Sequence, residues 1–251
     1  MKTTDWRTPR TSILGGAFFL IALAGCGGTD AGAESETGEP ADAATTETAG
    51  EATAGGDTGG GTMAEGALLN PNLASGEELA ALPGMTPGAV TAIMDGRPFM
   101  DMLALDAAIS GEVDEAGREA LYARMWVPLD LNTASSEEIQ LIPGVGDRMT
   151  HEFEEYRPYD GMARFRREMA KYVDDAEVDR LASYVFVPID LNTATDEEIL
   201  AIPGVGDRML HEFKEYRPYT SMEQFRREIG KYVDEAEVAR LERYVTIAGS
   251  Q

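Results

Sequence analysis

The sequence predicts an all-α fold of three tandem units, each about 60 residues long, after a disordered acidic linker. Three observations support this prediction. The sequence repeats with a period of 60 residues, each copy carries helix-start signals at the same places, and no segment alternates apolar and polar residues long enough to predict a strand.

The repeat is clearest in the second half of the chain. Leu131-Asn132-Thr133-Ala134 returns as Leu191-Asn192-Thr193-Ala194, and in an ungapped alignment 39 of the 60 positions in residues 131–190 are identical in residues 191–250. A diverged copy, which includes Leu82-Pro83-Gly84, precedes them. The predicted units are therefore residues 67–130, 131–190 and 191–251.

Residues 1–25 are typical of a lipoprotein signal peptide. Lys2, Arg7 and Arg10 precede an apolar run that is too short to span a bilayer, and the run ends in Leu23-Ala24-Gly25-Cys26, which resembles a bacterial lipobox. We expect Cys26 to be lipidated and to become the first mature residue. An ordinary secretory signal with a cysteine beside its cleavage site is the alternative.

Residues 26–66 form the predicted linker. After Cys26 the segment carries nine acidic residues, no basic residue and a single large apolar side chain, Met63. Such a composition cannot bury enough apolar surface to offset the entropy of ordering, so we expect a disordered tether between membrane and folded units.

Each unit is expected to contain four short helices. The first begins at a capping box and ends at the Pro-Gly pair, because proline cannot continue the helical hydrogen bonds. The second begins near Asp147 or Asp207, and the third carries the apolar positions of residues 162–169 or 222–229. The fourth begins at Asp174 or Asp234 and extends far enough to bury Val185 or Val245. The capping boxes are Ser75-x-x-Glu78, Ser135-x-x-Glu138 and Thr195-x-x-Glu198.

Composition excludes several classes of function. The chain has 45 acidic and 21 basic residues, for a net charge of −24, and contains one cysteine and two histidines. His151 and His211 are each flanked by glutamates but lack the second histidine of an HExxH zinc motif. We therefore expect no enzyme, no cofactor, no metal site and no small-molecule substrate.

Pro143-Gly144-Val145-Gly146, between two predicted helices, is the helix-hairpin-helix pattern. With Leu131-Asn132-Thr133-Ala134 and the later Arg157-Pro158-Tyr159, it resembles the extracytoplasmic DNA-receptor domain of the competence protein ComEA family. It is also similar to the tandem-hairpin extrinsic subunit of photosystem II, whose domain binds protein. These resemblances imply tandem-hairpin, SAM-like units.

The first resemblance implies that hairpin residues hold DNA phosphates without reading base sequence. Glycines permit positive φ and leave backbone N–H groups uncovered at a helix N-terminus, where the dipole favours an anion. The same glycines could equally serve only to turn the chain tightly between two packed helices. The implied phosphate contacts are Gly144, Val145, Gly146, Gly204, Val205 and Gly206.

Three departures from the family favour the purely structural interpretation. Asp147 and Asp207 follow the second glycine, where we expect them to cap the helix and repel phosphate. The second hairpin of each unit, Lys171-Tyr172-Val173 or Lys231-Tyr232-Val233, has no glycine. In the first copy, Gly84-Met85-Thr86-Pro87 has lost the second glycine.

A basic stripe on the third helix supports DNA binding. Each phosphate neutralised by such side chains adds salt-sensitive affinity, although pairing with Glu168, Glu228 and nearby acids would leave only a solvated face. The stripe comprises Arg164, Arg166, Arg167, Lys171, Arg226, Arg227 and Lys231.

The sequence thus leaves two functions open. The first is a lipid-anchored, extracytoplasmic protein that binds double-stranded DNA without sequence specificity, as in DNA uptake. The second is a scaffold of the cell envelope that binds a basic protein, which would suit the acidic charge. In both, we expect the chain on the periplasmic or outer-membrane face.

Overall fold

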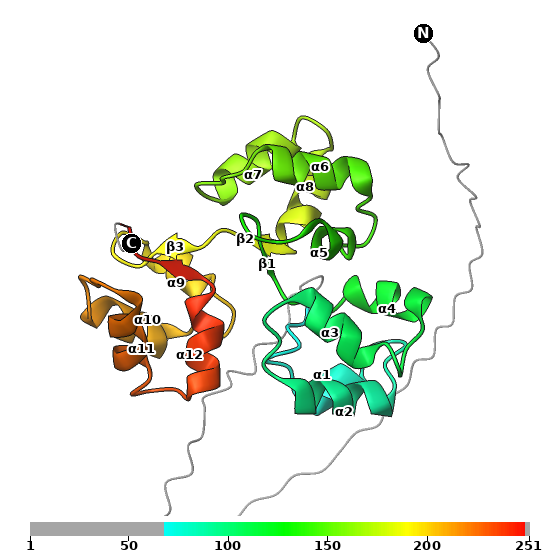
Figure 1. Cartoon of the computed structure of the whole chain (residues 1–251), viewed down its shortest axis with the longest axis horizontal. Helices are drawn as coiled ribbons and strands as arrows, with labels where there is room; N and C mark the ends of the chain where they lie inside the picture. The colour runs from blue at the N-terminus through cyan, green and yellow to red at the C-terminus, as the bar shows by residue number, and fades with distance from the viewer. Residues whose placement is uncertain (1–67, 249–251) are drawn as a thin grey trace, which may run out of the picture. The chain divides into compact units, whose positions relative to one another are not determined.

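The computed structural model describes residues 68–248, and this part of the chain is mostly α-helical, as the sequence predicts (Figure 1). The predicted leader, Cys26 and the linker lie outside the described residues. The first repeat contains α1 (Gly76–Ala80), α2 (Pro87–Gly96), α3 (Met102–Ile109) and α4 (Glu115–Tyr122). The second contains α5 (Ser136–Gln140), α6 (Asp147–Glu155), α7 (Met162–Met169) and α8 (Asp175–Ala182). The third contains α9 (Asp196–Leu200), α10 (Asp207–Glu215), α11 (Met222–Ile229) and α12 (Glu235–Glu242).

The first helix of each repeat begins at the predicted capping box. In α5 the Ser135 hydroxyl accepts from the backbone N–H of Glu138 at 3.2 Å, and the Glu138 carboxylate accepts from the backbone N–H of Ser135 at 2.9 Å. The same reciprocal pair begins α1 and α9. Asp174 and Asp234 cap α8 and α12, also as predicted.

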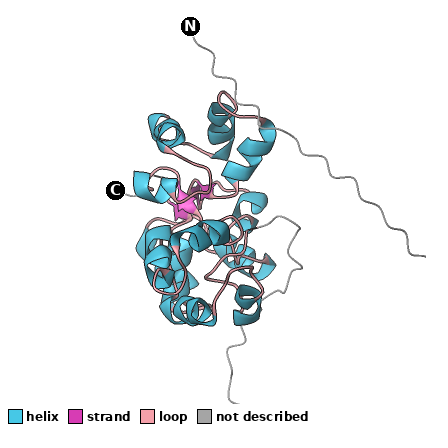
Figure 2. Ribbon diagram, turned by 90° about the vertical axis from the view of Figure 1, so that its right-hand side faces the viewer, coloured by secondary structure: helices cyan, strands magenta, loops and turns pink. Residues whose placement is uncertain are grey.

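Short parallel strand pairs close the repeats, which corrects the expectation that there are no strands (Figure 2). β1 (Leu129–Asp130) pairs with β2 (Val185–Phe186), and β3 (Ile189–Asp190) pairs with β4 (Val245–Thr246). A single bridge joins Leu69 to Met125 at the same place in the first repeat.

The strands also correct the predicted extent of the fourth helix. Val185 and Val245 are buried as expected, but they lie in β2 and β4, because α8 ends at Ala182 and α12 at Glu242. In each repeat the two paired positions are separated by the same 56 residues: 69 and 125, 129 and 185, 189 and 245. A strand at the start of each repeat therefore meets the chain that follows its fourth helix.

The buried apolar side chains form two clusters. One runs from Leu69 to Val185 and is shared by the first two repeats, whereas the other runs from Leu191 to Ile247 within the third. Trp126, 1% exposed, joins the first two repeats: its indole Nε1 donates to the Tyr184 carbonyl at 2.8 Å, and its ring packs edge-on against the Tyr184 ring at 5.0 Å.

A smaller aromatic pair occupies the corresponding place between the second and third repeats. Phe186 stands where Trp126 stands in the preceding repeat, and its ring lies 4.3 Å from that of Tyr244. Arg243 donates to the Pro128 carbonyl at 3.0 Å. Within residues 68–248, no helix has the length and the apolar character needed to cross a bilayer.

Candidate nucleic-acid interface

The hairpin of the second repeat joins α5 to α6. The turn closes when the backbone N–H of Val145 donates to the Ile142 carbonyl at 3.0 Å, and the Val145 side chain is buried in the core. Val205 repeats both features in the third repeat, where its N–H donates to the Ile202 carbonyl at 3.0 Å. The central apolar residue is therefore a core residue, and it fixes the turn against the helices.

The two glycines of each hairpin differ in their backbone conformation. The first has positive φ: 79° at Gly144, 81° at Gly204 and 87° at Gly84 of the diverged copy. The second does not, because φ is −114° at Gly146 and −110° at Gly206. Only the first glycine is required by the turn.

Packing does not require the second glycine either. A Cβ placed on Gly146 or Gly206 would meet nothing within 4 Å. The corresponding residue in the first repeat is Thr86, which begins α2 with a similarly extended backbone. A side chain therefore fits here, and its absence in the second and third repeats leaves the backbone uncovered.

The second glycine also leaves the helix that follows without a side-chain cap. Thr86 caps α2 by accepting from the backbone N–H of Ala89 at 3.1 Å, whereas α6 and α10 have no side-chain cap. Asp147 and Asp207 are the first residues of these helices, so the expectation that they cap them is wrong. The Asp147 carboxylate instead accepts from Gln140 Nε2 at 2.9 Å.

The two hairpins differ in how open they are. The atom nearest to a Cβ on Gly144 would be Nη2 of Arg180, at 3.8 Å. A Cβ on Gly204 would lie 3.0 Å from Nη2 of Arg240 and 3.2 Å from both terminal methyl groups of Leu73. The hairpin of the second repeat is thus the more accessible one.

The second turn of each repeat has the opposite character. Lys171-Tyr172-Val173 leads into α8, whose first turn is capped when the Asp174 carboxylate accepts from the Glu177 N–H at 2.9 Å. Asp234 caps α12 in the same way at 2.8 Å. A carboxylate already occupies the position that a phosphate would need.

The predicted basic stripe is largely neutralised on α7. Arg166 pairs with Asp179, and Glu168 binds both Lys171 and Arg167, the latter at 3.2 Å. Arg164 donates to the Pro158 carbonyl at 2.8 Å. The pairing with Glu168 weighed above is therefore present.

The stripe on α11 is paired in the same manner. Arg226 donates through Nε to Glu242 at 2.8 Å, and Glu228 binds Arg227 at 2.8 Å and Lys231. The hydrogen bond from Lys231 lowers the pKa of Glu228, and Lys171 does the same to Glu168. Both carboxylates consequently remain charged to lower pH than usual.

Sequence reasoning missed two arginines of the fourth helices, Arg180 and Arg240, which lie beside the first glycine of each hairpin. A signal was available, because the corresponding residue of the diverged copy is Ala120, and the same copy has lost the second hairpin glycine. Arginine and second glycine therefore occur together.

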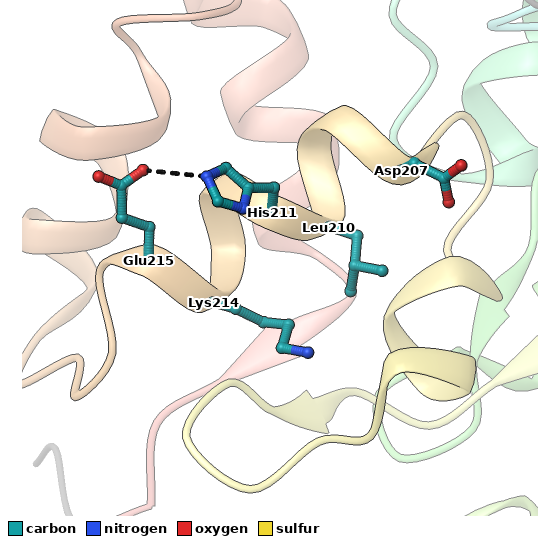
Figure 3. Close-up of a pocket in the computed structure, with 5 residues that line it drawn as sticks. All are labelled: Asp207, Leu210, His211, Lys214 and Glu215. Atoms are coloured by element: carbon teal, nitrogen blue, oxygen red, sulfur yellow. Dashed lines mark ion pairs between the residues drawn. The ribbon is translucent and has the colours of Figure 1, made fainter.

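The two histidines lie on the exposed faces of the second helices. His211 and Glu215 are 3.6 Å apart in a shallow pocket that Asp207, Leu210 and Lys214 complete (Figure 3). Lys214 pairs with Asp196 at 2.6 Å. Across the described part of the chain, no three acidic, histidine or cysteine side chains converge as metal ligands would.

Comparison of the chain with family models, curated proteins and solved structures gives no match.

Proposed function

We propose that this protein is a lipid-tethered, extracytoplasmic DNA-binding protein that holds the phosphate backbone without reading base sequence. The hairpin of the second repeat is the principal contact, and that of the third adds to it. Resemblance to the competence DNA receptor supports a place in DNA uptake.

The observation that carries the proposal is the bare second glycine. Neither a positive φ nor close packing requires glycine at positions 146 and 206. What glycine provides there is an uncovered helix N-terminus whose N–H groups face outward, at the positive end of the helix dipole. A phosphate oxygen fits this arrangement.

Charge sets the strength and the salt dependence of such binding. Because most of the basic stripe is already paired, few phosphates can be neutralised, and the affinity should be modest. A modest, non-specific affinity suits a receptor that must release its ligand. The lipid at Cys26 and the acidic linker would hold the folded repeats outside the membrane.

The test is a titration of the full chain, in detergent, with labelled duplex DNA of random sequence over a salt series. We expect binding at low ionic strength that weakens as salt rises. Gly146→Thr should reduce it more than Gly206→Thr, and the double variant should remove it. Circular dichroism melting serves as the control for folding, because threonine occupies this position in the first repeat. Unchanged binding by a folded double variant would refute the hairpin interface.

A second candidate, a protein-binding scaffold, is favoured by the internal pairing of the stripe. A surface whose cations are held by Glu168 and Glu228 presents alternating charge, not a basic track. If no DNA binds even at low salt, and an envelope protein of basic charge co-purifies with the wild-type chain in stoichiometric amount, this candidate replaces the first.

Membrane attachment is tested separately. Cys26→Ala should move the chain from the membrane fraction to the soluble fraction, and the wild-type N-terminus should carry acyl chains detectable by mass spectrometry. A wild-type chain that is soluble and cleaved without acylation would point to an ordinary secretory signal.

A further inference from the structure

We propose that Arg180 and Arg240 are positioning residues of the two hairpins, and that each transmits the packing of the preceding repeat to the hairpin of its own. The proposal rests on the function proposed above. It names a set of side chains that no hairpin motif contains.

Arg180 lies between the hairpin and the junction with the first repeat. Its Nη2 would be 3.8 Å from a Cβ on Gly144, and its guanidinium carbon lies 5.5 Å from the centre of the Tyr184 ring. The opposite side of that junction is Trp126, whose indole packs on Tyr184 and donates to its carbonyl. Trp126, Tyr184, Arg180 and Gly144 thus form one continuous line of contacts.

The third repeat contains the same line with one aromatic exchanged. Phe186 packs on Tyr244, and Arg240 reaches Gly204, where its Nη2 would be 3.0 Å from a Cβ. Burial raises the pKa of Tyr244, while the positive charges of Arg243 and Arg240 oppose that rise, which places the Arg240 charge beside the ring.

The geometry of the guanidinium favours positioning over direct contact with DNA. Both Nε and Nη2 of Arg180 donate to the Glu177 carboxylate at 2.7 Å, so its charge is already balanced. Arg240 makes the same paired contact with Glu237 at 2.6 Å and is only 2% exposed. A planar guanidinium held at both ends is a rigid support for the turn.

The first repeat is a natural comparison, because it lacks every part of this line except the first glycine. Ala120 replaces the arginine, Gly117 replaces its glutamate partner, and Arg124 replaces the tyrosine. It also has Thr86 in place of the second glycine, and no described repeat precedes it. The first repeat thus serves as support for the hairpin that follows.

The test compares Arg180→Gln with Arg118→Gln in the full chain, using the same DNA titration. Arg118 is matched because it also lies on a fourth helix and pairs with an acid, Asp106, at 2.7 Å. We expect Arg180→Gln to weaken binding about five- to tenfold, with an unchanged slope of affinity against salt, and Arg118→Gln to leave affinity unchanged. Hydrogen exchange of the Val145 N–H should accelerate in the first variant only.

A slope that falls by about one phosphate contact would show that Arg180 binds DNA directly and would overturn the positioning role. Unchanged affinity would also refute it, while loss of binding in Gly146→Thr would still stand, so the two proposals fail separately. Trp126→Phe, which installs the aromatic found at position 186, tests transmission: combined with Arg180→Gln it should add nothing to the effect of Arg180→Gln alone. Fully additive losses would contradict transmission through Arg180.

Discussion

Gly146 and Thr86 begin the second helix of adjacent repeats with the same extended backbone, yet only Thr86 places an oxygen on the first turn of its helix. The two residues differ in what they leave exposed. Replacement of threonine by glycine converts a closed helix end into an open one without altering the chain path.

The two glycines of one hairpin should respond differently to the same substitution. Gly144→Thr forces a β-branched residue to positive φ and should lower the free energy of unfolding by at least about 1–2 kcal/mol. Gly146→Thr should change it by only a few tenths of a kcal/mol, because both residues serve as N-caps. Urea denaturation of both variants measures the difference, and equal losses would show that the second glycine is structural as well.

Removing the acids that hold the basic stripe should strengthen DNA binding. Glu168→Gln and Glu228→Gln each release a lysine and an arginine, so affinity should rise and depend more steeply on salt. Glu155→Gln is the control, because it removes the same charge from an exposed glutamate beside His151. If the control strengthens binding equally, net charge and not the stripe is responsible.

The same carboxylates should make folding sensitive to acid. Hydrogen bonds from Lys171 and Lys231 hold the pKa of Glu168 and Glu228 below the ordinary value of 4.5. Their stabilising contribution is therefore complete above that value and is lost as the pH falls through the lower pKa of the folded state. Urea denaturation between pH 6 and pH 3 should show a smaller decline for the double variant Glu168→Gln/Glu228→Gln than for wild type, and identical declines would exclude this linkage.

The two core clusters should respond separately to loss of Trp126. Trp126→Ala removes a fully buried indole from the core shared by the first two repeats, at a cost of about 3–5 kcal/mol. The third repeat has its own cluster, so hydrogen exchange of Leu241 and its neighbours should remain slow while exchange around Leu121 accelerates. Uniform acceleration through both clusters would show a single cooperative unit.

Local signals in the sequence were sufficient for the helix starts. Capping boxes and aspartate N-caps involve residues three apart, so their geometry is set by the helix itself, and the structure confirms them at Ser135 and Asp174. Asp147 shows the limit of this reasoning. It resembles a cap by type, but the glycine before it takes the N-cap position and leaves Asp147 inside the first turn.

Features that depend on distant pairing could not be read from one strand of sequence. Each strand has two residues, too few to show alternation, and its partner lies 56 residues away. The place of Arg180 beside Gly144 likewise depends on how the fourth helix packs. Comparison of the three repeats with one another was the only route to it, through the joint loss of glycine and arginine in the first.

The strand pairs that close each repeat have a consequence for how such a chain can change in length. Because each repeat begins and ends at the same two-residue ladder, duplication of a 60-residue segment would insert a finished module whose ends already meet. The aromatic before each Val-Pro or Val-Pro-like joint then supplies the next module with its support. Growth by whole copies would multiply hairpins at a fixed interval, and the oldest or most altered copy could remain at the front as a platform.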